Sequence, residues 1–234
     1  MKTTKLIGLG IIGLITVLAI ENFTNIDIAL QNLCFNAGKR QWLINPELHK
    51  KLTYIFYDGL KIVMIFCAVF CLGNLLISIK QKNLRRYNHF SLIMLLSFII
   101  IPSLIAGAKA FTNVYCPYQL NIYNGLYPFV RVLENYPADF IQTKVGRCFP
   151  AGHATAGFAF LGLFYAFHQY KYRLIGLGIG LSLGWIAGIY QMLRGQHFLS
   201  HTLFSMVAAL TLIVIINQIV LRLEQKFPKL TQSE

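Results

Sequence analysis

The chain alternates long apolar segments with shorter polar ones, a pattern that predicts helices crossing a membrane. Spanning a hydrocarbon core takes about 20 helical residues. Six segments are long and apolar enough, and they cover approximately residues 6–20, 54–79, 90–107, 150–168, 174–193 and 202–221. We therefore expect an all-α integral membrane protein, in which residues 1–234 form a single domain with six transmembrane helices.

The first apolar segment also has features of a secretory signal. The basic sequence MKTTK precedes it, as in a signal peptide. No small-x-small cleavage site follows, because the next residues are Glu21, Asn22 and Phe23. We expect an uncleaved anchor, and cleavage would leave the orientation of the other helices unchanged.

The composition agrees with a membrane protein. Hydrophobic residues make up 56% of the chain and charged residues 12%, whereas soluble domains contain about 25% charged residues. This difference argues against a water-soluble enzyme. The net charge of +13 could suggest a nucleic-acid partner. Such proteins gather Lys and Arg on one face, and here long apolar segments separate them, so no nucleic-acid partner is expected.

The distribution of Lys and Arg predicts the orientation, because cytoplasmic loops carry an excess of these residues. With the N-terminus in the cytoplasm, eleven of them fall in inner segments and nine in the much longer outer segments. Both termini are therefore predicted to be cytoplasmic. The amphipathic segment 21–52 is expected to lie on the outer leaflet, and residues 109–149 are expected to form an outer loop.

Two opposite charges fall within the second apolar segment. Asp58 and Lys61 are three residues apart and share one face of a helix. We expect a charge pair near the outer interface, and a transport or catalytic role is the alternative.

Three histidines and one lysine are expected to converge at the outer face. His153 lies in RCFPAGHATAGF, His197 and His201 lie in QMLRGQHFLSH, and Lys109 ends the third apolar segment. His153 could give a proton to a leaving oxygen. His197 and His201 are four residues apart, so on a helix they would share one face. One imidazole could attack while the other holds it in the right tautomer.

The segment FPAGH has the features of an anion site. Pro150 suits the first turn of a helix, and Gly152 lets a backbone N–H approach a ligand closely. We therefore expect the fourth span to begin here, with its amides directed at a bound phosphate.

At these residues the chain resembles the type-2 phosphatidic acid phosphatase superfamily, membrane enzymes with six helices and an outward-facing site. The family pattern begins with Lys, six residues and Arg-Pro, followed later by Pro-Ser-Gly-His. Here the first part reads Lys109, six residues, Cys116 and Pro117, and the second reads PAGH at 150–153. Cys and Ala thus replace the Arg and Ser of the family.

The third part of the family pattern is Ser-Arg, five residues, His, three residues and Asp. Here His197 takes the nucleophile position, Gln191 stands where Arg is expected and His201 stands where Asp is expected. The resemblance covers about residues 90–205, within a motif-bearing core of about 90–221. A similar CP, PAGH and RGxHFxSH set occurs in a divergent bacterial branch of membrane acid phosphatases.

The replaced side chains would cradle phosphate in the family, and nearby cations could substitute for them. Arg194 lies one turn after Gln191 on the same helical face, and Arg147 precedes CFPAGH. Lys109 is retained in place. A decayed fold without catalytic activity is the alternative.

The resemblance implies a reaction through phosphohistidine. His197 would attack phosphorus, with His201 as its orienting group, and His153 would protonate the leaving alkoxide. The equatorial oxygens would be neutralised by Lys109 and Arg194 together with Arg147. No cofactor and no metal are expected.

The expected substrate is a membrane lipid phosphate or diphosphate, dephosphorylated on the periplasmic face of a bacterial cytoplasmic (inner) membrane. Lipid A, undecaprenyl diphosphate, phosphatidylglycerophosphate and phosphatidate are candidates. The same intermediate could pass to an alcohol, which would make the protein a phosphotransferase. The histidine pair could instead belong to a metal-dependent hydrolase, and the missing arginines could indicate a non-enzymatic transporter or scaffold.

Two cysteines lie beside the phosphate motifs. Cys116 precedes Pro117, and Cys148 precedes Phe149 and Pro150. A disulfide between them would attach the outer loop to the mouth of the site and stabilise the fold by roughly 3 to 4 kcal/mol. Two free thiols are the alternative.

Overall fold

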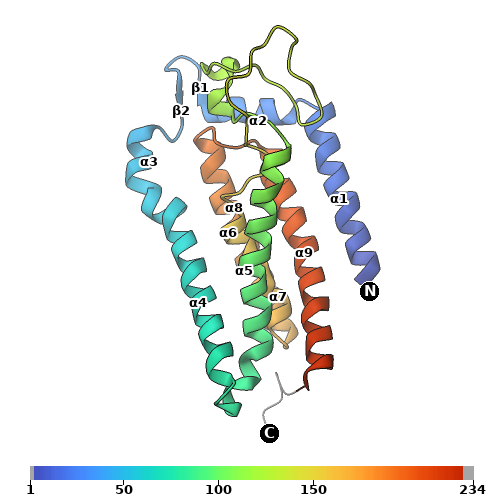
Figure 1. The fold of residues 1–234 in the computed structure, drawn as a ribbon. Helices are drawn as coiled ribbons and strands as arrows, with labels where there is room; N and C mark the ends of the chain where they lie inside the picture. The colour runs from blue at the N-terminus through green and yellow to red at the C-terminus, as the bar shows by residue number, and fades with distance from the viewer. Residues whose placement is uncertain (1–2, 229–234) are drawn as a thin grey trace.

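Long helices that run side by side form the body of the protein (Figure 1). The computed structural model describes residues 3–228. Its helices and strands are α1 Thr3–Phe23, α2 Ile26–Cys34, β1 Phe35–Asn36, β2 Gln41–Trp42, α3 Pro46–Thr53, α4 Leu60–Ser78, α5 Asn88–Ala108, α6 Thr155–Phe158, α7 Leu163–Ala166, α8 Tyr170–Leu193 and α9 Leu199–Lys226. A π-helical turn, Tyr54–Gly59, joins α3 to α4, and 3-10 helical turns cover Lys82–Tyr87, Lys109–Phe111, Pro117–Gln119, Asn121–Tyr123 and Ala159–Gly162.

Five helical segments of the described chain are long and apolar enough to cross a membrane. They are Thr3–Phe23, Pro46–Ser78, Lys82–Phe111, Tyr170–Leu193 and Leu199–Lys226. Each coincides with one of the apolar segments predicted from the sequence, so the chain is a largely helical membrane protein. On α4, large apolar side chains such as Ile62, Phe66 and Phe70 are exposed, as expected of a surface that faces lipid.

The remaining apolar segment forms a shorter helix, Thr155–Ala166. This helix begins at Thr155, so the prediction that it begins at Pro150 is wrong. Residues 149–154 are held instead by the neighbouring helix, because the Ala151 N–H donates to the His201 carbonyl (3.1 Å) and the Ser205 hydroxyl donates to the Ala151 carbonyl (2.9 Å). A sixth crossing of the membrane stays a prediction.

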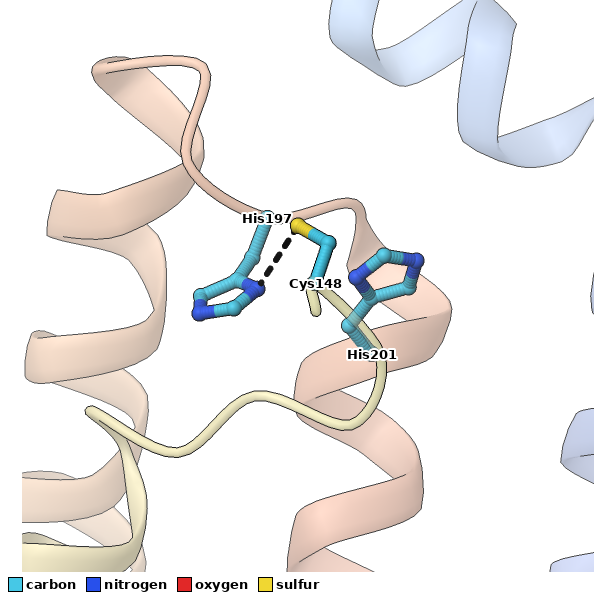
Figure 2. Close-up of side chains that lie close together, drawn as sticks. All are labelled: Cys148, His197 and His201. Carbon is cyan, nitrogen blue, oxygen red and sulfur yellow. Dashed lines mark hydrogen bonds between the residues drawn. The ribbon is translucent and has the colours of Figure 1, made fainter. Parts of the chain in front are cut away.

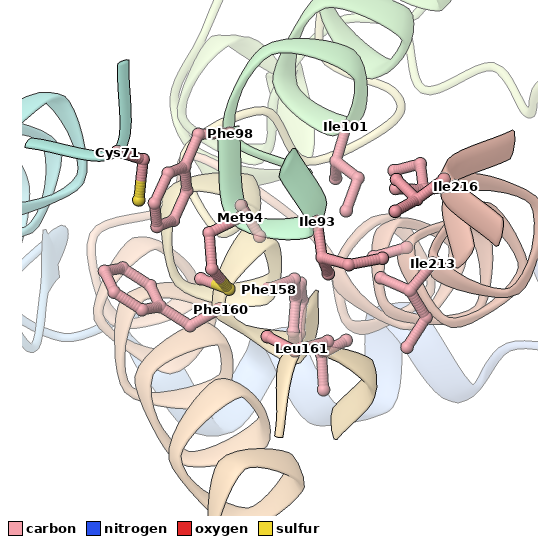
Figure 3. Close-up of a cluster of buried hydrophobic side chains, with 14 of the residues drawn as sticks. Cys71, Ile93, Met94, Phe98, Ile101, Phe158, Phe160, Leu161, Ile213 and Ile216 are labelled. Atoms are coloured by element: carbon pink, nitrogen blue, oxygen red, sulfur yellow. The ribbon is translucent and has the colours of Figure 1, made fainter. Parts of the chain in front are cut away.

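The short helix lies at the centre of the hydrophobic core. Phe158 and Leu161 are fully buried, in one hydrophobic cluster with Ile93 of α5 and Ile213 of α9 (Figure 3). A helix this short is stabilised by packing rather than by its own hydrogen bonds. The long helices around it therefore hold the turn that precedes it, residues 149–154.

Glycines on α8 allow the short helix to approach it closely. A Cβ at Gly180 would lie 2.5 Å from the backbone nitrogen of Leu161, and a Cβ at Gly157 would lie 2.4 Å from the backbone nitrogen of Gly184. Small residues at this spacing let two helices pack backbone against backbone, as in many membrane proteins.

One end of the bundle carries a cap, which we define as α2, β1, β2 and residues 112–149 (Figure 1). The start of α1 and the end of α9 lie toward the opposite end of the bundle. Aromatic side chains pack inside the cap, with the Trp42 and Tyr123 rings 5.1 Å apart. Arg131 joins the cap to the connection between α1 and α2 by donating to the Asn22 carbonyl (2.9 Å) and to Asn25 Oδ1 (2.6 Å). Segment 21–52 contains α2, a hairpin and most of α3, and its expected place on the outer leaflet stays a prediction.

We expect Gly180→Ala to lower the midpoint of thermal unfolding in detergent, because the new methyl group would collide with backbone atoms that cannot move aside. The loss should be about 1–3 kcal/mol, the usual size of an overpacking effect. Gly178→Ala, on the same helix with nothing within 4 Å of its Cβ, is the control and should leave the midpoint unchanged or raise it slightly. Equal midpoints for the two variants would contradict the close packing.

Candidate active site

The motif residues meet beneath the cap, at the end of the bundle. Lys109 follows directly after α5, His153 lies in the turn before α6, and His197 lies in the loop 194–198 between α8 and α9. Segments that are about 40 residues apart in the sequence therefore contribute to one site. Their meeting agrees with the convergence expected from the motif spacing.

The two imidazoles of His153 and His197 contact each other directly. Nδ1 of His153 lies 3.3 Å from Nε2 of His197, within hydrogen-bonding distance. The His197 side chain is 2% exposed. Its pKa lies well below the usual value because burial disfavours the charged form, and the positive charge of Lys109 adds to the effect. His197 is therefore neutral at pH 7, the form that has a free lone pair.

A disulfide lies against the other side of the His197 ring. Cys116 and Cys148 are bonded, with their Cα atoms 5.0 Å apart, and Cys148 Sγ lies 3.5 Å from His197 Nδ1 (Figure 2). A disulfide sulfur has no proton to donate, so the hydrogen bond requires the proton on Nδ1. This tautomer leaves the lone pair on Nε2, the nitrogen that faces His153. The disulfide sulfur is thus an acceptor that favours this tautomer of His197.

His201 does not have the position expected of the orienting group. Because α9 begins at Leu199, His197 precedes the helix and does not share a face with His201. Cys148 lies between the two rings (Figure 2), and their centroids are 5.7 Å apart. Neither ring nitrogen of His201 has a hydrogen-bond partner among the described residues. The ring instead packs edge-on against Phe149, at 5.1 Å between centroids.

Lys109 packs across Gly152. A Cβ at position 152 would lie 3.1 Å from Lys109 Cε and 3.2 Å from its Nζ. The absence of a side chain at Gly152 therefore makes room for the ammonium group beside the His153 turn. This role adds to the close approach of a backbone N–H that the sequence suggested.

Arg194 lies beside Gln191, as predicted. Its Nη1 donates to Gln191 Oε1 at 3.2 Å, and its guanidinium lies 5.5 Å from the centre of the Tyr190 ring. The guanidinium thus takes up a position next to the residue that replaces the family's arginine.

Arg147 is exposed and lines a separate cavity with Lys144, Tyr118 and Gln119. No described contact brings its side chain to the histidines. The structure therefore does not place the Arg147 side chain with the other predicted phosphate ligands.

A cavity of about 370 Å³ opens beside His153 and includes a residue that the sequence did not assign to the site. Its lining is Lys61, Met64, Pro102, Ala106, Lys109, Gly152, His153, Thr155 and Ala156. Burial lowers the pKa of His153 to about 4, and three cations add smaller contributions. In decreasing order these are Lys109, Arg194 and Lys61.

Lys61 was expected to pair with Asp58, but the described residues show no ion pair between them. The signal that could have assigned it to the site is its position within an apolar segment, since such charges usually serve a function.

One group of side chains has the spacing of a metal site. Donor atoms of Cys148, His197 and His201 lie within 4.8 Å of one another. Metals bind cysteine as a thiolate, and the Cys148 sulfur is bonded to Cys116. The residues in this state do not fit a metal ion.

Two buried polar side chains of α2 fix the helix ends on either side of the loop that carries His197. Asp27 Oδ1 accepts from the Ser200 N–H (2.9 Å), and Oδ2 accepts from the Ser200 hydroxyl. Four residues further along α2, Gln31 Nε2 donates to the Met192 carbonyl (2.9 Å). The carboxylate thus caps the start of α9 and the amide caps the end of α8.

We call these two caps, Asp27 and Gln31, the clamp. Their role was not predicted from the sequence, although residues four apart share one face of a helix. Burial raises the pKa of Asp27 above its usual value, while the hydrogen bonds from Ser200 favour the carboxylate. Such a group is kept inside a protein only where its hydrogen bonds are satisfied.

Comparison with known proteins assigns the chain to a family. The family model described as the PAP2 superfamily matches residues 87–225. Because the match covers more than half of the chain, the protein belongs to the PAP2 superfamily, whose members are phosphatases. Searches of curated proteins and of solved structures returned no match.

We expect Asp27→Ala to lower both kcat and the free energy of unfolding, because the capping bonds to Ser200 are lost and His197 is less firmly positioned. The loss of stability should be about 1–2 kcal/mol, as for other helix caps. Asp27→Asn keeps an acceptor oxygen and should lose less. Glu47→Ala is the control, since that carboxylate is exposed and pairs with exposed Lys51. Wild-type kcat and thermal midpoint in Asp27→Ala would show that the clamp is unimportant.

Proposed function

We propose that this member of the PAP2 superfamily is a lipid phosphate phosphatase or diphosphatase that works through a phosphohistidine on His197. The observation that carries the proposal is the hydrogen-bonded pair of His197 Nε2 and His153 Nδ1, 3.3 Å apart. Lys109 lies beside this pair at the end of the bundle. A buried neutral nucleophile, an adjacent proton donor and a cation are the parts that phosphoryl transfer requires.

In the first step, His197 Nε2 forms a bond to phosphorus as the bond from phosphorus to the ester oxygen breaks. The entering phosphoryl group separates the two imidazoles, and His153 delivers a proton to the leaving oxygen. The negative charge of the phosphate offsets the nearby cations and raises the pKa of His153 from its low value, so that the ring holds a proton when it is needed. In the second step His153 takes a proton from water, which attacks phosphorus and frees His197.

The equatorial oxygens of the transferred group are neutralised by Lys109 and Arg194. Each well-placed charged donor can stabilise such a transition state by about 3 kcal/mol. Arg147 is left out of this set because its side chain is exposed and no described contact joins it to the histidines, whereas the charge of Arg194 acts on His153.

The cavity next to His153 supports a lipid substrate, because much of its wall is apolar. Met64, Pro102 and Ala106 come from two membrane-spanning helices. We place the site at the periplasmic face of a bacterial cytoplasmic membrane, in line with the greater number of Lys and Arg in the inner segments. Lipid A, undecaprenyl diphosphate, phosphatidylglycerophosphate and phosphatidate remain the candidate substrates.

We expect His197→Ala to lower the release of free phosphate from a panel of lipid phosphates by at least about a thousandfold, since it removes the nucleophile. His153→Ala should lose about a hundredfold to ten-thousandfold, the contribution of a general acid. His168→Ala is the matched control, because this exposed histidine stacks on His89 and contacts none of the site residues described above. Full activity in His197→Ala would refute the proposal, and label that moves to a second lipid instead of water would identify a phosphotransferase.

We also expect vanadate to inhibit the enzyme, because it can adopt the geometry of phosphorus in the transition state. A chelator should have no effect, because side chains supply the positive charges that stabilise the phosphate. Both are measured as phosphate release at fixed substrate concentration. Activity that is lost in the chelator and restored by zinc would show that a metal takes part.

A further inference from the structure

Lys61 is a cation within a membrane-spanning segment, and the described structure provides no acid to neutralise it. It lies near the start of α4, in the span Pro46–Ser78. The ion pairs of the described residues do not include it, and Asp58 does not pair with it. Its neighbours Ile62, Val63 and Ile65 are exposed and apolar. Charges in such segments are costly and mark sites where an anion or a polar partner is bound.

The cavity beside His153 is the space that Lys61 shares with the candidate active site. One wall is the α4 face that carries Lys61 and Met64, and the other is the α5 face with Pro102 and Ala106, which ends at Lys109. The turn with His153 lies behind them. Two lysines on two different helices thus line one cavity together with the proposed general acid.

The cations around His153 exceed what a single phosphoryl group requires. A phosphate monoester carries about −1.5 to −2 charges at pH 7, which Lys109 and Arg194 together balance. Lys61 adds a third positive charge on the side of the cavity formed by α4. A diphosphate carries a further negative charge on a second phosphate group. Complementary charge of this kind provides specificity between related ligands.

We propose that Lys61 binds the second phosphate of a lipid diphosphate, so that the enzyme prefers lipid diphosphates to lipid monophosphates. This inference rests on the proposed phosphatase function. The terminal phosphate lies between His197 and His153, and the phosphate attached to the lipid lies in the cavity against Lys61. The apolar side chains of Met64, Pro102 and Ala106 then receive the first part of the lipid chain.

The test compares farnesyl diphosphate with farnesyl phosphate, two probes that share one lipid chain. We expect Lys61→Met to lower kcat/KM for the diphosphate by at least about tenfold and for the monophosphate by less than about threefold. Lys61→Arg keeps the charge and should retain most of the preference. Lys50→Met, which removes an exposed lysine of α3, is the control and should behave as wild type.

Inorganic diphosphate, which has no lipid chain, distinguishes a lipid site from a site for the free anion. We expect its kcat/KM to be far below that of farnesyl diphosphate, because it cannot use the apolar wall. Equal values for these two substrates would overturn the assignment to a lipid. A titration of His153 by NMR is an independent readout, since removing the Lys61 charge should raise the pKa of His153 above about 4.

Equal losses on the two farnesyl substrates, or no loss on either, would overturn the role of Lys61 in choosing diphosphates. Neither outcome affects the phosphohistidine proposal, which depends on His197→Ala. Conversely, a wild type that releases no phosphate from any substrate would refute the proposed function and this inference together. The thermal midpoint of each variant shows whether it is folded, so that a loss of activity from unfolding is distinguished from a loss of phosphate binding.

Discussion

Buried hydrogen bonds between α2 and two helix ends hold the loop that carries His197, the proposed nucleophile. His197 lies outside regular structure, so no helical hydrogen bonds of its own keep it in place. Its position follows from where α8 stops and where α9 starts, and Gln31 and Asp27 bind those two ends. A buried carboxylate is unstable without its donors. The α2 helix can therefore dock only when both helix ends are formed, which makes the cap and the site one cooperative unit.

Burial keeps the His197 imidazole in the form that the proposed reaction needs. Burial and the positive charge of Lys109 depress the pKa of His197, and so leave one ring nitrogen unprotonated. Neither His153 nor His197 can neutralise Lys109, since an imidazole is either neutral or positively charged. An anionic group that enters the site would offset the positive charge of Lys109. In the proposed mechanism, binding and activation therefore depend on the same few side chains, above all Lys109.

The parts of this protein that follow from local sequence could be predicted, and those that follow from packing could not. Apolar length alone identified five spans, and motif spacing was enough to expect Lys109, His153 and His197 together. The start of the short helix at Thr155 could not be predicted from the sequence, because hydrogen bonds to α9 hold the preceding residues outside the helix. The position of Lys61 beside His153 could not be predicted either, because it depends on how α4 packs against α5. The residue spacing within each helix does not specify that packing.

His201 is a case in which the sequence predicted a contact that the fold does not form. The four-residue spacing would place it beside His197 on a helix, but the helix starts between them and a disulfide occupies the space that remains. The His197 Nδ1 therefore faces a disulfide sulfur. A thiol, unlike a disulfide, can donate as well as accept, so reduction would weaken the preference for one tautomer. Because disulfides persist in oxidising compartments, the surroundings of the proposed nucleophile depend on the redox conditions around the protein.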